Sequence, residues 1–354
     1  MQKRMTGKSS LSVTSPGKRP AQPASRMRPF PLFAVLTLLA LAAFVLSLLS
    51  GSMDTGWQDL AAVMLDDTQA LGTRVILDLR WPRSAAAFVT GALLALAGGF
   101  MQVLLRNPLA DPYVLGVSGG AATGALLSLL LGLGGFWLQG SAFAGALLSI
   151  LIVFGLSHGH GSWTMNRLLL TGVVIAAGWG AVIGFLLVLS PEQNLRGMLF
   201  WLMGDLSYAG APLPGLVILL AGLPVALMLG RPLNILAHGE LAAASLGVSV
   251  LALRRLVYVI ASVFTATAVT LAGSIGFVGL IVPHMLRLRG IRDHRILLPA
   301  AALLGGSLLL IADTLARTLL APRQLPVGIL TALVGVPVFL YLLYQGRELH
   351  GREG

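Results

Sequence analysis

The chain has no cysteine, and only 10% of its 354 residues are charged. The missing cysteines exclude disulfides and thiolate metal sites, although they do not fix the cellular compartment. A soluble domain carries about 25% charged residues, so this chain cannot cover a water-facing surface of its size. It also lacks the alternating apolar pattern of an outer-membrane barrel. Since 56% of the residues are hydrophobic, the sequence predicts an all-α polytopic membrane protein.

The net charge of +11 is unevenly distributed along the chain. Residues 1–29 are rich in Lys and Arg, contain no acid, and are otherwise largely Pro, Ser and Gly, so we expect a disordered cytoplasmic tail. Because the positive charge lies in this tail and in loops, it does not predict nucleic-acid binding. The first apolar run lacks a convincing cleavage site, and we expect a retained span rather than a cleaved signal peptide.

Ten apolar runs approach or reach the length of about 20 residues that crosses a bilayer. They cover 30–50, 82–105, 113–135, 138–157, 168–190, 212–230, 254–273, 275–288, 296–314 and 326–344. An inside N-terminus puts most Lys and Arg in inside loops and makes both termini cytoplasmic. The outer loop 51–79 is amphipathic around 57–71, which is typical of a surface helix. We therefore expect a transmembrane domain over 30–346 and a cytoplasmic C-terminal tail over 347–354.

The most informative stretch is 91–121, where two glycine-rich apolar segments flank the polar turn 106–112. Gln102 lies within the first segment, four residues before Arg106. Small residues let helices approach closely, and a buried amide hydrogen-bonds across helices or lines a hydrated path. The stretch therefore predicts a packed, polar-lined hairpin in a protein that moves a solute.

Several motifs resemble those of ABC-importer permeases for iron–siderophore complexes, haem and vitamin B12. They are the hairpin 91–118, the stretch Leu79-Arg80-Trp81-Pro82-Arg83, and the segments 200–207, 233–248, 276–284, 312–317 and 325–329. Asp205 stands where the family more often has serine, and Gln324 stands where it often has glutamate. The resemblance implies a type II importer permease fold, with about ten transmembrane helices per subunit and a homodimer.

The resemblance also implies roles for three groups of residues. Docking of a binding protein at the outer mouth falls on Arg80, Arg83 and Arg317. The cytoplasmic gate and pathway fall on Gln102, Asn107, Pro108 and Leu109. Coupling to the ATPase falls on the segment 231–253, at Gly239, Glu240, Ala243, Leu246 and Gly247. Each group also has a plainer explanation, because arginines anchor helix ends at headgroups, prolines stop helices, and such a loop can be a solvated connector.

The chain has no nucleotide site of its own. Gly7-Lys8-Ser9 imitates the end of a P-loop, but Gln2 occupies the position of the required first glycine. We therefore expect no cofactor on this chain and ATP hydrolysis in a partner, so the chain itself is not an enzyme. The implied assembly is a permease homodimer, two ATP-binding cassette subunits and a periplasmic or lipid-anchored substrate-binding protein, surrounded by lipid of the bacterial inner membrane.

Four further polar residues have structural explanations. His158 and His160 offer too few ligands for a stable metal site, and no metal is expected. His284 follows Pro283, and we expect it to bond a backbone carbonyl that the proline leaves free. Asp313 is expected to pair with Arg317 at i,i+4.

Two other classes of protein stay open at this point. An ion-coupled secondary transporter of a small amphiphilic solute needs titratable groups inside the membrane, and the spans contain almost none. An intramembrane enzyme needs a nucleophile–base or paired-acid arrangement, and none is evident. An importer permease is the leading hypothesis. Its cargo stays open, because siderophore, haem and cobalamin permeases share these motifs.

Overall fold

The structure is a computed structural model, and it describes residues 29–51, 53, 55–65, 71–157, 165–209 and 211–351. Every regular element within these ranges is a helix, as the sequence predicts. The predicted N-terminal tail, apart from Pro29, and the histidines of the H-G-H sequence lie outside the described residues.

Seven helices are long and apolar enough to cross a membrane, and three shorter apolar helices accompany them. The long ones are α1 (Pro29–Leu49), α4 (Trp81–Leu104), α6 (Phe136–Ser157), α7 (Met165–Leu189), α9 (Leu213–Ala237), α11 (Val250–Ala272) and α13 (His294–Thr318). The shorter ones are α5 (Val117–Leu130), α12 (Val278–Leu288) and the apolar part of α14 (Val327–Gly351). Each of the ten predicted spans overlaps one of these helices.

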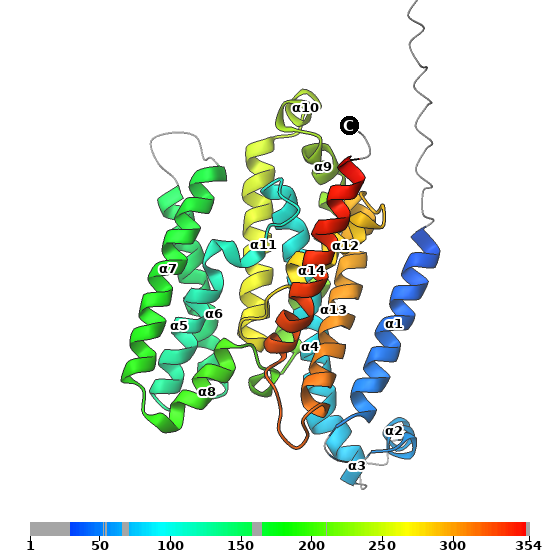
Figure 1. Ribbon diagram of the computed structural model, residues 1–354, viewed down its shortest axis with the longest axis vertical. Coiled ribbons are helices and arrows are strands. Elements are labelled where there is room, and N and C mark those ends of the chain that lie inside the picture. Colours follow the sequence, from blue (N-terminus) through cyan, green and yellow to red (C-terminus); the bar gives the residue numbers. More distant parts are fainter. Residues whose placement is uncertain are drawn as a thin grey trace, which may run out of the picture.

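Short helices and turns lie at the two ends of the bundle. They are α2 (Trp57–Met64), α3 (Leu71–Arg74), the π-helical turn η1 (Val75–Arg80), the 3-10 turns η2 (Pro112–Leu115) and η3 (Leu206–Tyr208), α8 (Glu192–Leu202) and α10 (Glu240–Ser245). Figure 1 shows α2, α3 and α8 at the lower end and α10 at the upper end, where α1 starts and α14 finishes. The long helices are thus capped by short helical elements at both ends.

Several boundaries differ from the predicted ones. The surface helix predicted around 57–71 is α2, but from Leu71 the chain is already helical and continues through η1 into α4. Helix α8 lies outside every predicted span and surface helix. Helix α9 continues through Pro232 to Ala237, so the predicted connector 231–253 begins as helix. Neighbouring helices and side chains can satisfy the backbone that a proline leaves free, which explains why the chain does not break there.

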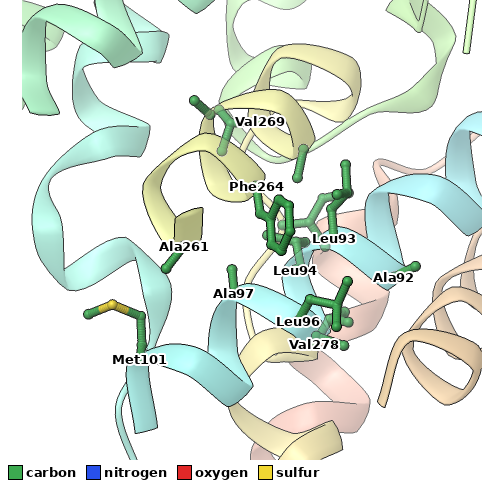
Figure 2. Close-up of a cluster of buried hydrophobic side chains, with 14 of the residues drawn as sticks. Ala92, Leu93, Leu94, Leu96, Ala97, Met101, Ala261, Phe264, Val269 and Val278 are labelled. Carbon is green, nitrogen blue, oxygen red and sulfur yellow. The ribbon is translucent and has the colours of Figure 1, made fainter. Parts of the chain in front are cut away.

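Helix α4 forms the centre of the bundle. It packs closely against α13 and α11, and also contacts α12 and α9. Figure 2 shows Leu93 and Leu94 of α4 beside Phe264 of α11, and these side chains are almost fully buried. By contrast, α7 buries few of its side chains. Helix α4 is therefore a buried central helix that runs between the two ends of the bundle.

The two arms of the predicted hairpin do not pack mainly against each other. Helix α4 packs against α13 and α11, whereas α5 packs against α6 and α7. The chain crosses between them through 105–116, and α11 contacts both arms. The hairpin prediction is therefore wrong in its packing, because the sequence shows that both arms are rich in small residues but not which helices they contact.

The small residues do permit close helix contacts. A Cβ added to Gly98 would overlap the backbone of Gly279 in α12, and one added to Gly91 would overlap the carbonyl of Gly305 in α13. A Cβ added to Gly120 of α5 would likewise overlap the carbonyl of Gly145 in α6. Helices in lipid associate through such close packing, since water supplies no hydrophobic drive between them.

Substituting Gly98 by Ala tests this contact. We expect Gly98→Ala to reduce the free energy of unfolding by about 1–3 kcal/mol, because backbone atoms must move to admit the methyl group. The measurement is the thermal unfolding midpoint of the purified protein in detergent. Gly155→Ala is the matched control, since nothing lies within 4 Å of its added Cβ. Equal midpoints for the two variants would contradict the contact.

Candidate functional site

At the lower end of the bundle, Arg83 is the centre of a polar cluster. Its Nη2 donates to Asp313 Oδ1 at 2.9 Å, and its Nε lies 3.1 Å from both carboxylate oxygens. Its Nη1 donates to Gln324 at 2.9 Å and to Ser207 at 3.2 Å. This one guanidinium therefore joins α4, α13 and the segments around η3 and Gln324.

Asp313 is fully buried and has a second arginine partner. Arg317 Nε lies 3.1 Å from Asp313 Oδ2, so the predicted i,i+4 pair is confirmed. Arg317 Nη2 also donates to Ser47 Oγ at 2.8 Å, which ties α13 to α1. Burying a carboxylate is costly unless it is paired and hydrogen-bonded, and the two arginines supply those partners for Asp313. The pair of Arg83 with Asp313 was not predicted, since only the fold brings positions 83 and 313 together.

Arg80 points into the segment that follows α1. Its Nη1 donates to the Leu48 carbonyl at 2.8 Å and to Thr55 Oγ1 at 2.6 Å, and its Nη2 donates to the Met53 carbonyl at 2.5 Å. Arg80 and Arg317 are only 4% and 6% exposed. In the described subunit they therefore make internal contacts.

The structure does bring the three predicted docking arginines together. A cavity of about 480 Å³ at this end is lined by Arg80, Arg83 and Arg317, together with Ser207 and Gln324. Of the three, Arg83 has the most accessible side chain, at 13% exposure. Asp205, which replaces the family's usual serine, accepts from the Ser207 N–H at 2.9 Å and lies 3.9 Å from Arg83. This additional acid shapes η3 beside the cavity.

Near the upper end, Gln102 joins α4 to α12. Its side-chain nitrogen donates to the Leu280 carbonyl at 3.0 Å and reaches the Gly279 carbonyl at 3.4 Å, while its oxygen accepts from Arg287. Pro283 has no N–H for the carbonyl four residues earlier, which is that of Gly279. Gln102 thus satisfies a backbone group that the proline leaves free, as expected of a buried amide.

This arrangement corrects the prediction for His284. Neither ring nitrogen of His284 has a hydrogen-bond partner among the described residues. The carbonyl freed by Pro283 is instead bonded by Gln102, whose longer side chain reaches it from the neighbouring helix. The prediction chose His284 as the partner of this carbonyl because it is next to Pro283 in the chain. The close approach of α4 to α12 instead brings Gln102 to the carbonyl.

The predicted gate residues lie in an exposed turn at the upper end. Asn107 Oδ1 accepts from the Leu109 N–H at 2.9 Å, and the Asn107 carbonyl accepts from the Ala110 N–H. Asn107, Pro108 and Leu109 are exposed, whereas Gln102 is 3% exposed. The structure therefore groups three of the four residues and places Gln102 inside the bundle.

The crossing segment after this turn is anchored through Asp111 and Tyr113. Asp111 Oδ1 accepts from the Tyr113 N–H at 2.7 Å, and the Tyr113 hydroxyl accepts from the Ile275 N–H at 3.1 Å. Burial raises the pKa of Asp111 above its usual value, although the Tyr113 hydrogen bond opposes the rise. These contacts hold the crossing segment against the chain that leads into α12.

Helix α10 lies beside the turn 106–109. Gly239 and Gly247 bracket it with positive φ values of 126° and 79°. Ala243 is fully buried, while Leu241 and Leu246 are 89% and 68% exposed. The predicted coupling residues therefore occupy one small element with an inner and an outer face, and Leu241 is an outward residue that the sequence analysis missed.

Glu240 connects α10 to two other segments. Its carboxylate lies 3.1 Å from Arg106 Nη2 and also pairs with Arg254 of α11. Arg106 precedes Asn107 in the chain, so the salt bridge joins the predicted coupling helix to the predicted gate. The sequence analysis named Glu240 but could not identify these partners, because 134 positions in the chain separate it from Arg106.

Asn234 joins the end of α9 to the start of α13. Its Nδ2 donates to Asp293 at 2.7 Å, and its Oδ1 lies 2.9 Å from the His294 backbone nitrogen and 2.6 Å from His294 Nδ1. Burial alone would raise the pKa of Asp293, but hydrogen bonds from Asn234 and Arg295 and nearby positive charge lower it overall. The described residues contain no group of three acidic or histidine side chains placed to hold a metal ion.

Comparisons with known proteins agree with this architecture. The model of the FecCD transport family matches residues 38–345. The chain is 41% identical to the vitamin B12 import system permease BtuC of Citrobacter koseri, over 88% of this chain and 94% of the relative. It is 42% identical to the uncharacterised ABC transporter permease YvrB of Bacillus subtilis, over 78% of this chain and 82% of the relative.

Two solved structures are also similar. An inward-facing metal-chelate type ABC transporter matches with a TM-score of 0.79 and 33% identity, covering 90% of this chain and all of the other. PsaBC from Streptococcus pneumoniae, solved in complex with Fab, matches with a TM-score of 0.52 and 17% identity, covering 80% of this chain and 94% of the other, and supports the fold alone. The chain therefore belongs to the FecCD transport family and is a multi-pass membrane permease subunit of an ABC importer of the BtuC type.

Proposed function

We propose that this permease imports a metal chelate, with cobalamin as the first candidate and iron–siderophore complexes or haem as the others. The similarity to vitamin B12 import permeases supports cobalamin. ATP hydrolysis occurs in a partner ATPase, and a substrate-binding protein delivers the cargo, as membership of the family implies. The observation that carries the proposal is the position of two polar clusters at opposite ends of α4, one around Arg83 and one around Glu240.

The upper end of the bundle faces the cytoplasm in this proposal, and the protein lies in the bacterial inner membrane. Arg231, Arg255, Arg289 and Arg292 lie in or beside the connections at this end, which follows the positive-inside rule. Two copies form one pathway between them. Exposed apolar side chains on α7 and α14, such as Val174 and Leu333, support a face that lipid or a second copy covers.

Coupling runs through α10. Leu241 and Leu246 provide the apolar outer surface that contacts the ATPase, while the buried Ala243 and the Glu240 salt bridges hold α10 to the permease. A short helix held in this way moves as a rigid body. The permease performs no bond chemistry and binds no cofactor. It changes the populations of inward- and outward-open states in response to its partners.

Reconstitution tests the proposal as a whole. Proteoliposomes containing this chain and its ATPase are expected to accumulate radiolabelled cobalamin when the binding protein and ATP are supplied. Uptake is expected to stop when the ATPase carries a disabled nucleotide site. Uptake that persists without ATP hydrolysis would show an ion-coupled carrier instead. Uptake of an iron chelate in place of cobalamin would keep the permease function and correct the cargo.

Arg83 is the docking residue with the clearest prediction. Arg83→Gln leaves Asp313 paired with Arg317, so the fold is expected to persist. A hydrogen bond to a charged group contributes about 1.5–3 kcal/mol, so the affinity for the binding protein is expected to fall by about tenfold or more. Calorimetric titration of the permease–ATPase complex in nanodiscs measures this affinity. Arg196→Gln, which changes an exposed arginine of α8, is the control, and an unchanged affinity for Arg83→Gln would refute docking at this residue.

Glu240 is the coupling residue with a matched test. Glu240→Gln keeps the shape of the side chain but removes the charge that holds Arg106 and Arg254. Because the pair with Arg106 is partly exposed, we expect a change in stability of only about 0.2–1 kcal/mol. The number of cargo molecules imported per ATP hydrolysed should nevertheless fall several-fold. Glu192→Gln in α8 is the control, and an unchanged ratio for Glu240→Gln would show that the salt bridge carries no coupling.

A further inference from the structure

A second polar cavity lies at the upper end, behind the turn 106–109. Its volume is about 240 Å³, and its wall includes Gln102, Arg106, Arg287 and His294. These residues come from α4, the crossing segment, α12 and α13, and Ala237 adds the end of α9. Five segments therefore line this partly open cavity, and its polar side chains are not assigned to any ligand.

The cavity carries an excess of positive charge. Arg106 shares Glu240 with Arg254. Arg287 has no carboxylate within 4 Å among the described residues, and its Nη1 donates to the neutral Gln102 oxygen. The nearest acids, Glu240 and Asp293, do not line the cavity and already have partners of their own. A half-enclosed guanidinium without a carboxylate favours an anionic ligand.

His294 adds a second and independent observation. Asp293 accepts from Asn234 Nδ2, which fixes the Asn234 oxygen as the acceptor for His294. His294 Nδ1 must therefore carry the proton of the neutral ring, and Nε2 is an acceptor. His294 is 4% exposed, and its Nε2 has no hydrogen-bond partner among the described residues. An unsatisfied buried acceptor of this kind costs about 1–3 kcal/mol, which a bound donor would recover.

The ligand must then offer anionic oxygens to the arginines and one O–H to His294. Carboxylates and sulfate are fully ionised near neutral pH and have no O–H to donate. A phosphate monoester has its second pKa near 6, and the second ionisation of inorganic phosphate falls near neutral pH, so both have an accessible form that retains one O–H. We propose that this cavity binds a phosphate group, with Arg287 and Arg106 holding its anionic oxygens and His294 Nε2 accepting its P–O–H proton.

Two sources could supply this group at the inner surface of a membrane. One is the headgroup of a phosphate-monoester lipid such as phosphatidic acid, since basic pockets between transmembrane helices bind anionic headgroups. The other is soluble phosphate. Both present the same chemistry to Arg287 and His294, so the experiment separates them by the probe. Binding is measured on the permease alone, and its outcome is independent of the proposed transport function.

The experiment uses the purified full chain in phosphatidylcholine nanodiscs. Sodium phosphate and sodium sulfate are titrated at equal ionic strength by calorimetry, and a parallel preparation contains phosphatidic acid, with lipid retention measured by mass spectrometry. We expect phosphate to bind more tightly than sulfate, or phosphatidic acid to be selectively retained, and the two results identify the soluble and lipid sources. Equal binding of phosphate and sulfate, or no binding of any probe, would overturn the proposal.

Variants locate the binding to this cavity. Arg287→Gln removes the charge, and His294→Asn keeps a donor near Asn234 while removing Nε2. Each is expected to weaken binding of the phosphate probe by about tenfold or more. Arg289→Gln is the control, because Arg289 ends the same helix but does not line the cavity. Arg287→Lys, which retains a positive charge, should recover part of the binding. Wild-type affinity in both Arg287→Gln and His294→Asn would overturn the assignment.

Discussion

The close approach of α4 to α12 is the contact on which the rest of the structure depends. It requires the absence of side chains at Gly98 and Gly279, whose backbones would otherwise overlap with an added Cβ. At this distance Gln102 can reach the carbonyl that Pro283 leaves free. Because no water is available in the bilayer interior, an unsatisfied carbonyl there would cost several kcal/mol. The two glycines thus bring Gln102 close enough to bond the carbonyl that Pro283 leaves without a donor.

This junction also organises the two ends of the molecule. Helix α4 begins at the Arg83 cluster and ends beside the turn that contains Arg106, so a single buried helix joins the cavity at the lower end to the region around α10. At the lower end, the shared carboxylate of Asp313 fixes α4 to α13 and, through Arg317, to α1. At the upper end, the carboxylate of Glu240 fixes α10 to the crossing turn and to α11. One acid shared by two arginines is used at both ends.

Much of the fold could be predicted from the sequence, because the length of an apolar run and the distribution of positive charge depend on local composition. The i,i+4 pair of Asp313 with Arg317 is confirmed for that reason. Seven of the ten predicted spans coincide with helices long enough to cross a membrane, and the other three coincide with shorter apolar helices. The packing of α4 and α5 against different neighbours could not be predicted, since glycine content shows that a helix packs closely but not its partner. Helix α8 was missed because it is short and of mixed polarity. The prediction for His284 was wrong because it considered only neighbours in the chain.

For the candidate sites too, individual residues could be predicted but their contacts could not. The resemblance to a known family pointed to Arg83 and Glu240, but their partners Asp313 and Arg106 come from distant segments that only the folded chain brings together. Leu241 was missed, although its exposure on α10 gives it the same outward position as Leu246. The three arginines at the lower end also differ in exposure, since Arg83 is more accessible than Arg80 and Arg317, and no sequence motif shows this difference. The family resemblance predicted the candidate residues, and the tertiary contacts give their partners.

We propose that the salt bridge of Glu240 with Arg106 makes α10 and the turn 106–109 move as one unit when the ATPase changes state. The lack of native cysteine allows spin labels to be placed at pairs of introduced cysteines without background. The most direct measurement is the distance between labels at Leu241 and Leu109 in the assembled complex, with and without bound ATP. The account predicts an unchanged distance for this pair, while the distance from Leu241 to a label at Trp57 of α2 changes. A distance between Leu241 and Leu109 that changes with nucleotide would contradict it.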